Sequence, residues 1–172
     1  MKRLLLFTFL GFTAYTAKTQ TVDYIVPATD LINMTVQTGD MCFDPNEYKQ
    51  TSPGTMWGFQ WTSTVGTTPT SVTVDWISVS NQGLTIPTTL NGMADANVPM
   101  NVSSCGFVSQ VFTMNPANYN PGGLNTVMLD YSANIISEQI LPPIPGWYVH
   151  IEVVYPVPCN DPDIPTLTAS SP

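Results

Sequence analysis

Short runs of alternating apolar and polar residues, separated by proline and glycine, constrain the fold of this chain most. On a β-strand successive side chains point to opposite faces of the sheet, whereas a helix repeats its apolar positions about every 3.6 residues. Trp57, Phe59 and Trp61 share one face of such a run, and the segments 72–76 and 147–155 alternate in the same way. Each pattern predicts a strand with one buried face and one face that is wet or less buried.

Sixteen prolines and eleven glycines are spread along the chain and separate these runs. After the first 19 residues, no window keeps the helical period over a useful length. Strands are predicted at residues 22–26, 31–37, 55–63, 71–80, 84–90, 98–102, 106–114, 125–131 and 147–155. Eight or nine short strands at this spacing predict an all-β fold, an antiparallel β-sandwich.

Residues 1–19 have the pattern of a secretory signal peptide. A basic start is followed by an apolar run at 4–14, and Ala17 and Thr19 place small side chains before a cleavage site at Gln20. A membrane anchor needs about 20 apolar residues, which this run does not reach. We therefore expect the mature chain to be secreted or displayed at the cell surface.

The distribution of charge excludes two classes of partner. Only 9% of the residues are charged, and beyond residue 18 the one basic residue, Lys49, stands against twelve acids. Without residues 1–19 the net charge is −11. Nucleic acid and anionic membrane surfaces both require clustered lysine or arginine. We expect no nucleic-acid binding and no membrane insertion of the mature chain.

The domain organisation follows from length and composition. Residues 20–158 predict one β-sandwich domain, because about 140 residues suffice for a single core. From Cys159 the sequence changes to Asn-Asp-Pro-Asp-Ile-Pro, and proline-rich segments of this kind are extended. Residues 159–172 are interpreted as a linker and the start of a truncated following repeat.

Export makes a disulfide the first interpretation of the three cysteines, Cys42, Cys105 and Cys159, whose spacing fits no zinc motif. Three cysteines allow three pairings. We favour Cys42 with Cys105, since both lie inside the predicted domain and Cys159 lies at its exit. Closing a loop of about 60 residues would stabilise the fold by roughly 4 kcal/mol in the chain-entropy model.

Few residues could carry catalysis. His150 is the single histidine, on the outward face of its strand, with Glu152 two residues further on the same face. A histidine–carboxylate pair can orient a nucleophile, but the sequence has no Gly-x-Ser-x-Gly motif and no second histidine. The acids form no recognisable pair for glycoside hydrolysis. We interpret His150 as a member of a surface cross-strand polar pair and expect no enzymatic activity.

Oxygen ligands for a hard cation are concentrated in one loop. Asp40, Asp44, Asn46 and Glu47 lie within eight residues of one another, which predicts a structural calcium site. The alternative is that these residues serve as turn formers. No other cofactor is expected.

Three segments together carry a family resemblance: residues 88–92 (TTLNG), 114–126 (MNPANYNPGGLNT) and 146–155 (GWYVHIEVVY). They resemble the N-terminal sandwich domain of large secreted, adhesin-like surface proteins of gliding-type Gram-negative bacteria. Residues 165–170 (PTLTAS) are similar to the start of the immunoglobulin-like repeats that follow in such proteins. The resemblance implies a jelly-roll or galactose-binding-like sandwich, export, and downstream domains of the same protein as neighbours.

Candidate ligand-binding residues come from aromatic side chains that are harder to bury than the tryptophans. Tyr48 and Tyr148 are two of them, and Tyr119 lies between Asn118 and Asn120 in an amide-rich loop. A tyrosine ring can stack on a sugar while amides bond its hydroxyls, so Tyr48, Asn118, Tyr119 and Asn120 are predicted to bind a ligand. The alternative is that the loop shapes a turn and Tyr119 covers the edge of the core.

These features predict a noncatalytic extracellular β-sandwich module of a larger cell-surface or adhesin-like protein, serving display, adhesion or structural capping. Two alternatives are a carbohydrate-binding module that uses loop aromatics and amides, and an accessory domain of a secreted hydrolase. The expected partner is a glycan or another surface protein.

Overall fold

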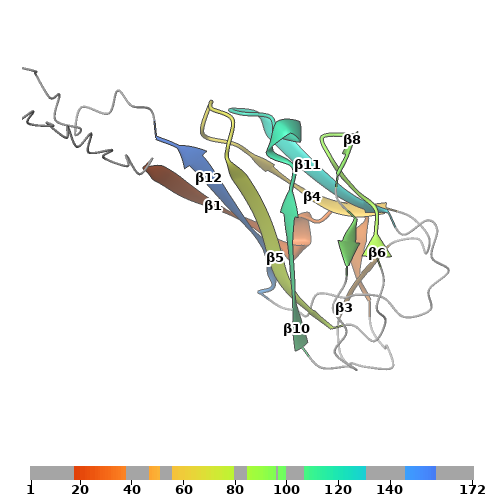
Figure 1. The fold of residues 1–172 in the computed structure, drawn as a ribbon. Coiled ribbons are helices and arrows are strands. Elements are labelled where there is room, and N and C mark those ends of the chain that lie inside the picture. The colour runs from red at the N-terminus through yellow and green to blue at the C-terminus, as the bar shows by residue number, and fades with distance from the viewer. Residues whose placement is uncertain are drawn as a thin grey trace, which may run out of the picture.

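The computed structural model describes residues 18–37, 47–50, 56–79, 85–95, 97–99, 107–130 and 146–157. Within these residues the chain forms twelve β-strands and two three-residue 3-10 helices, η1 (Ala28–Asp30) and η2 (Pro116–Asn118) (Figure 1). This confirms the predicted fold class, an all-β antiparallel sandwich. Neither of these short helices is long enough to cross a bilayer, and the described part of the chain contains no other helix that could.

Two four-stranded antiparallel sheets form the layers. Sheet A has the order β1 (Thr19–Pro27), β12 (Tyr148–Pro156), β5 (Ser71–Val79) and β10 (Phe107–Met114). Sheet B has the order β4 (Met56–Thr62), β11 (Leu124–Asp130), β7 (Thr88–Leu90) and β8 (Met93–Ala94). Two small sheets pair β2 (Met34–Gln37) with β3 (Glu47–Gln50) and β6 (Thr85–Ile86) with β9 (Val98–Pro99).

The core lies between sheets A and B and uses the inward faces that the alternation predicts. Trp57 of β4 and Trp76 of β5, one from each layer, meet edge to face with ring centroids 5.6 Å apart. Such an aromatic pair adds about 0.5–1.5 kcal/mol to the free energy gained from burial. The buried residues of the three alternating strands are Trp57, Phe59, Trp61, Val72, Val74, Trp76, Val149, Ile151, Val153 and Tyr155.

Two of the predicted strands are shortened or divided for local backbone reasons. The strand expected at 31–37 begins only at Met34, because Asn33 has a positive φ of 57° and breaks the extended backbone before it. The strand expected at 84–90 is divided into β6 and β7 at Pro87, whose ring removes the N–H that a continuous ladder requires.

Strands β3 and β8 were not predicted. β8 forms a hairpin with β7 through Asn91 and Gly92, whose positive φ values of 55° and 77° suit the tight turns that join antiparallel strands. β3 occupies Glu47–Gln50 and begins with one of the four residues of the predicted calcium loop.

Several sequence predictions fall outside the described residues. These are most of the signal peptide, the segment from residue 158 onward, and Cys42, Cys105 and Cys159. The described sandwich begins with β1 at Thr19, and the Lys18 carbonyl accepts a hydrogen bond of 3.0 Å from the Val157 N–H.

Candidate functional site

The outer face of sheet A carries an unusual number of apolar side chains. Ile25, Ile77, Val111 and Tyr148 point away from the core and are between 46% and 55% exposed. A sheet with one wet face ordinarily alternates apolar residues inward with polar residues outward. The four residues interrupt that alternation on all four strands of sheet A, and we refer to them as the outer patch.

Strand register places the outer patch around His150. Ile25 of β1 lies opposite His150 of β12, His150 lies opposite Asp75 of β5, and Asp75 lies opposite Val111 of β10. Side chains directly opposite on adjacent strands are about 4.5–5.5 Å apart at Cβ, so these residues form one row across the sheet. Tyr148 lies two residues before His150 on β12, and Ile77 lies two residues after Asp75 on the antiparallel strand β5. Both extend the face on the same side of this row.

His150 is held between two carboxylates. Its Nδ1 lies 2.9 Å from Asp75 Oδ2, and its Nε2 lies 2.9 Å from Asp23 Oδ1 on β1. An ionised carboxylate only accepts hydrogen bonds, so both contacts together require an N–H at each ring nitrogen, which is the imidazolium form. Side-chain contacts therefore tie three adjacent strands, β1, β12 and β5, across the surface of sheet A.

The same geometry shifts the titration of the ring. The hydrogen bond with Asp75 raises the pKa of His150 above its usual 6.5, and the Asp23 hydrogen bond and the charges of both carboxylates act in the same direction. Partial burial opposes them but is outweighed. With both nitrogens engaged, the ring has no free lone pair with which to act as a general base.

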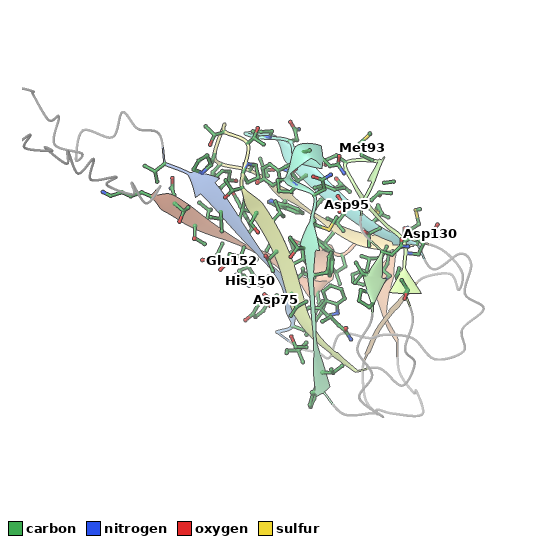
Figure 2. All side chains as sticks on the ribbon, in the orientation of Figure 1. Asp75, Met93, Asp95, Asp130, His150 and Glu152 are labelled. Carbon is green, nitrogen blue, oxygen red and sulfur yellow. The ribbon has the colours of Figure 1, made fainter. Side chains whose placement is uncertain are left out.

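The partner of His150 differs from the one that the sequence favoured. Glu152 shares the outward face, and Figure 2 shows Asp75, His150 and Glu152 together along the outer side of β5 and β12. The ring nitrogens nevertheless bond to Asp75 and Asp23. Asp75 lies directly opposite His150 and Asp23 lies diagonally across from it, and side chains at both kinds of cross-strand position are within reach of each other. The structure agrees with the interpretation of His150 as a member of a surface cross-strand polar pair, with Asp75 and Asp23 as its partners in place of Glu152.

This arrangement predicts that stability depends on pH through His150. The pKa of His150 is raised in the folded state, so its protonated ring stabilises the fold fully below the unfolded pKa of 6.5. This stabilisation is lost as the pH rises through the higher pKa of the folded state. After screening by solvent we expect a loss of about 0.5–1 kcal/mol in the free energy of unfolding. Urea unfolding of the wild type and of His150→Gln between pH 5.5 and 9 measures this loss, as the pH-dependent difference between their free energies of unfolding. An identical pH profile for both would contradict the prediction.

Tyr119, predicted to stack on a ligand, lies in the core instead. It is 6% exposed, its ring packs against Trp61 at 6.2 Å between centroids, and its hydroxyl lies 2.8 Å from that of Tyr155. The structure agrees with the alternative interpretation, in which this residue covers the edge of the core. Its burial leaves almost no ring surface available to a sugar.

The two flanking amides are occupied within the protein. Asn118 Nδ2 donates to Asp95 Oδ2 at 3.0 Å, and Asn120 Nδ2 donates to the Leu124 carbonyl at 3.3 Å. The carboxylate of Asp95 also accepts from the Asn115 N–H, at 3.0 Å and 3.1 Å to its two oxygens. The amide-rich loop therefore satisfies its own polar groups and shapes the turns around η2.

The remaining predicted site residues are only partly covered by the structure. Tyr48 and Glu47 belong to β3, whose side chains are not described, and Asp40, Asp44 and Asn46 lie outside the described residues. Where side chains are described, no group of three or more histidine, cysteine, aspartate or glutamate residues is placed to hold a metal ion. The calcium site at residues 40–47 stays a prediction.

Sequence reasoning missed the composition of the outer patch and the role of Asp23. The alternation of 72–76 and 147–155 already placed Asp75, Tyr148 and His150 on outward faces. A search for apolar residues at outward positions of predicted strands would also have found Ile25 and Ile77. The outward positions of the predicted strands therefore carry a signal for the outer patch, whereas Asn118, Tyr119 and Asn120 were predicted from a loop.

No protein-family model and no curated protein matches the sequence. Among solved structures the chain is similar to a family 35 carbohydrate-binding module from Clostridium thermocellum, with a TM-score of 0.47, 13% identity, and coverage of 79% of this chain and 99% of that one. It is also similar to the C-terminal CBM6 of LamC, a marine laminarinase from Zobellia galactanivorans, with a TM-score of 0.42, 8% identity, and coverage of 78% and 99%. A third is the module CBM6cm-2 of Cellvibrio mixtus lichenase 5A in complex with cellotriose, with a TM-score of 0.43, 9% identity, and coverage of 78% and 97%.

Proposed function

We propose that this domain is a noncatalytic carbohydrate-binding module that holds a glycan chain on the outer face of sheet A. The observation that carries the proposal is the half-exposed Tyr148 beside the Asp23–His150–Asp75 network, on a face that also exposes aliphatic residues. A pyranose ring has apolar C–H faces and polar hydroxyl edges. An aromatic ring packs against the C–H faces of the sugar, and carboxylates accept hydrogen bonds from its hydroxyl groups.

The distribution of exposed apolar residues supports this face over the others. Single exposed apolar residues are normal on a protein surface, whereas a contiguous group marks a contact site. In sheet B, Met56 and Leu124 are exposed at opposite ends of the β4–β11 pair, Met93 is exposed on β8, and none of the three is aromatic. The outer patch of sheet A combines four such residues with the hydrogen-bonding groups of Asp23 and Asp75.

Glycan binding is compatible with the surface protein that the sequence resembles. In an exported chain displayed at the cell surface, a module of this kind would contribute adhesion by contact rather than by chemistry. Binding of sugars also requires no basic residues, of which the chain has only one beyond residue 18.

Affinity electrophoresis tests the proposal. The purified domain is run through gels that contain hydroxyethyl cellulose, laminarin, mannan or dextran, and at least one polysaccharide is expected to retard it. Tyr148→Ala is expected to weaken that binding about tenfold or more, since a lost aromatic contact costs roughly 1.5–3 kcal/mol.

Met93→Ala is the matched control, because it also removes an exposed apolar side chain but from β8 of sheet B. Its mobility should equal that of the wild type in every gel. Retardation of Tyr148→Ala as strong as that of the wild type, or no retardation in any gel, would disprove the proposed function.

A further inference from the structure

We infer that the outer face of sheet A selects neutral glycans and rejects polyanionic ones, because Asp75 lies within the outer patch, Asp23 and Glu152 lie beside it, and His150 is the one described group there that opposes their charge. This inference rests on the proposed function and adds the class of ligand. It concerns the charges of the face, whereas the proposed function depends on the ring of Tyr148.

The acids come from three adjacent strands. Asp23 of β1 lies opposite Glu152 of β12, and Asp75 of β5 lies opposite His150 of β12. The side chains of Asp23 and Asp75 are 59% and 40% exposed, so solvent and ligands can reach both carboxylates. The outward residues of β10 opposite this region, Val111 and Thr113, are uncharged.

Protonation of His150 reduces the negative charge of the face without reversing it. Three carboxylates and one imidazolium leave an excess of two negative charges, and three remain when the ring is neutral. The phenol of Tyr148, on the same part of β12, contributes no positive charge. A carboxylate or sulfate group on a glycan would therefore meet like charges at every pH near neutrality.

The two lysines in the described part of the chain, Lys18 and Lys49, lie away from these acids. Lys49 belongs to β3, which pairs with β2 in a separate small sheet. Lys18 precedes β1 and lies five residues from Asp23, which is about 17 Å along an extended strand. That distance exceeds the Debye length of about 8 Å at physiological ionic strength.

The length of the face increases the expected difference in affinity between neutral and anionic glycans. From Tyr148 to Glu152 the strand rises about 13 Å, which is the length of about two or three pyranose units. A polyuronate or a sulfated glycan lying across it would place two or more charges near the three carboxylates. At low salt we expect such a ligand to bind at least about tenfold more weakly than its neutral counterpart.

The test compares each neutral polysaccharide with its own carboxymethyl derivative in affinity gels at 20 mM salt. We expect the neutral form to retard the domain at least about ten times more strongly than the derivative, and 0.5 M sodium chloride to narrow the difference. Glu152→Gln should increase binding of the derivative about threefold relative to binding of the neutral polymer.

Gln60→Lys is the matched control. It also raises the net charge by one, but at an exposed position of β4 in sheet B. It should leave both affinities as in the wild type. Equal retardation by a neutral polymer and its derivative at low salt would overturn the charge selection and leave the proposed function intact. No retardation by any polymer would instead remove the proposed function, and the inference with it.

Discussion

Replacing Gly58 with alanine is expected to destabilise the domain by more than about 3 kcal/mol. Gly58 lies in β4 opposite Met128 of β11, and its N–H and carbonyl also exchange hydrogen bonds of 3.2 Å and 2.8 Å with Ile32. A Cβ at this position would overlap the Val127 carbonyl oxygen and lie 2.6 Å from Met128 Sδ. The Met128 side chain can turn aside, but the Val127 oxygen and the Met128 Cα belong to the backbone of β11, so the clash can be relieved only by moving β4 and β11 apart.

Urea unfolding measures this loss. Gly66→Ala is the control, since nothing lies within 4 Å of a Cβ built there and its backbone does not have a positive φ. Alanine at such a position is neutral or stabilises by up to about 1 kcal/mol, through the reduced entropy of the unfolded chain. If the two variants unfolded at the same urea concentration, the close approach of β4 and β11 would not be the reason for the glycine.

Removing the side chain of Asn125 is expected to cost about 2–4 kcal/mol. The residue is completely buried in β11. Its Oδ1 accepts from the Asn120 N–H at 2.7 Å and from Asn91 Nδ2 at 3.0 Å, and its Nδ2 donates to the carbonyls of Asn120 and Gly123 at 3.0 Å and 3.2 Å. Asn125→Ala would leave several of these partly buried groups without a partner.

The stabilities of further variants distinguish a loss of hydrogen bonds at Asn125 from a loss of side-chain volume. Asn125→Asp keeps the side-chain volume and the two accepting contacts, but it turns a carboxylate oxygen toward the Asn120 and Gly123 carbonyls in a completely buried site, so it should not recover the stability that the alanine variant loses. Gln60→Ala, on the exposed side of β4, should change it by less than about 0.5 kcal/mol. A wild-type unfolding midpoint for Asn125→Ala would show that the loop around η2 does not depend on this side chain.

The layers of the fold could be predicted because their signal is local. Alternation over five to nine residues is enough to assign the inward face of β12, where Val149, Ile151 and Val153 are all fully buried. The hairpin of β7 and β8, by contrast, was not predicted, although Asn91 and Gly92 form its turn. Two-residue strands carry too few positions for a period to be recognised.

The candidate site could not be assembled in the same way, because it depends on register. Asp75 and Asp23 are 75 and 127 residues away from His150 in the sequence, and no local pattern states which strands are adjacent. Tyr119 was assigned to a ligand because its neighbours are polar. Its burial follows from contacts with Trp61 and Tyr155, which come from other strands.

The pairing of β1 with β12 has a consequence for the timing of folding. β1 is an edge strand, and β12, its one neighbour in sheet A, pairs with it from Thr19 opposite Pro156 to Pro27 opposite Tyr148. During synthesis β1 therefore has no pairing partner in sheet A until nearly 160 residues have left the ribosome. Contacts this distant in sequence also form slowly. Sheet A is consequently completed only when β12, the last of its four strands in the sequence, becomes available.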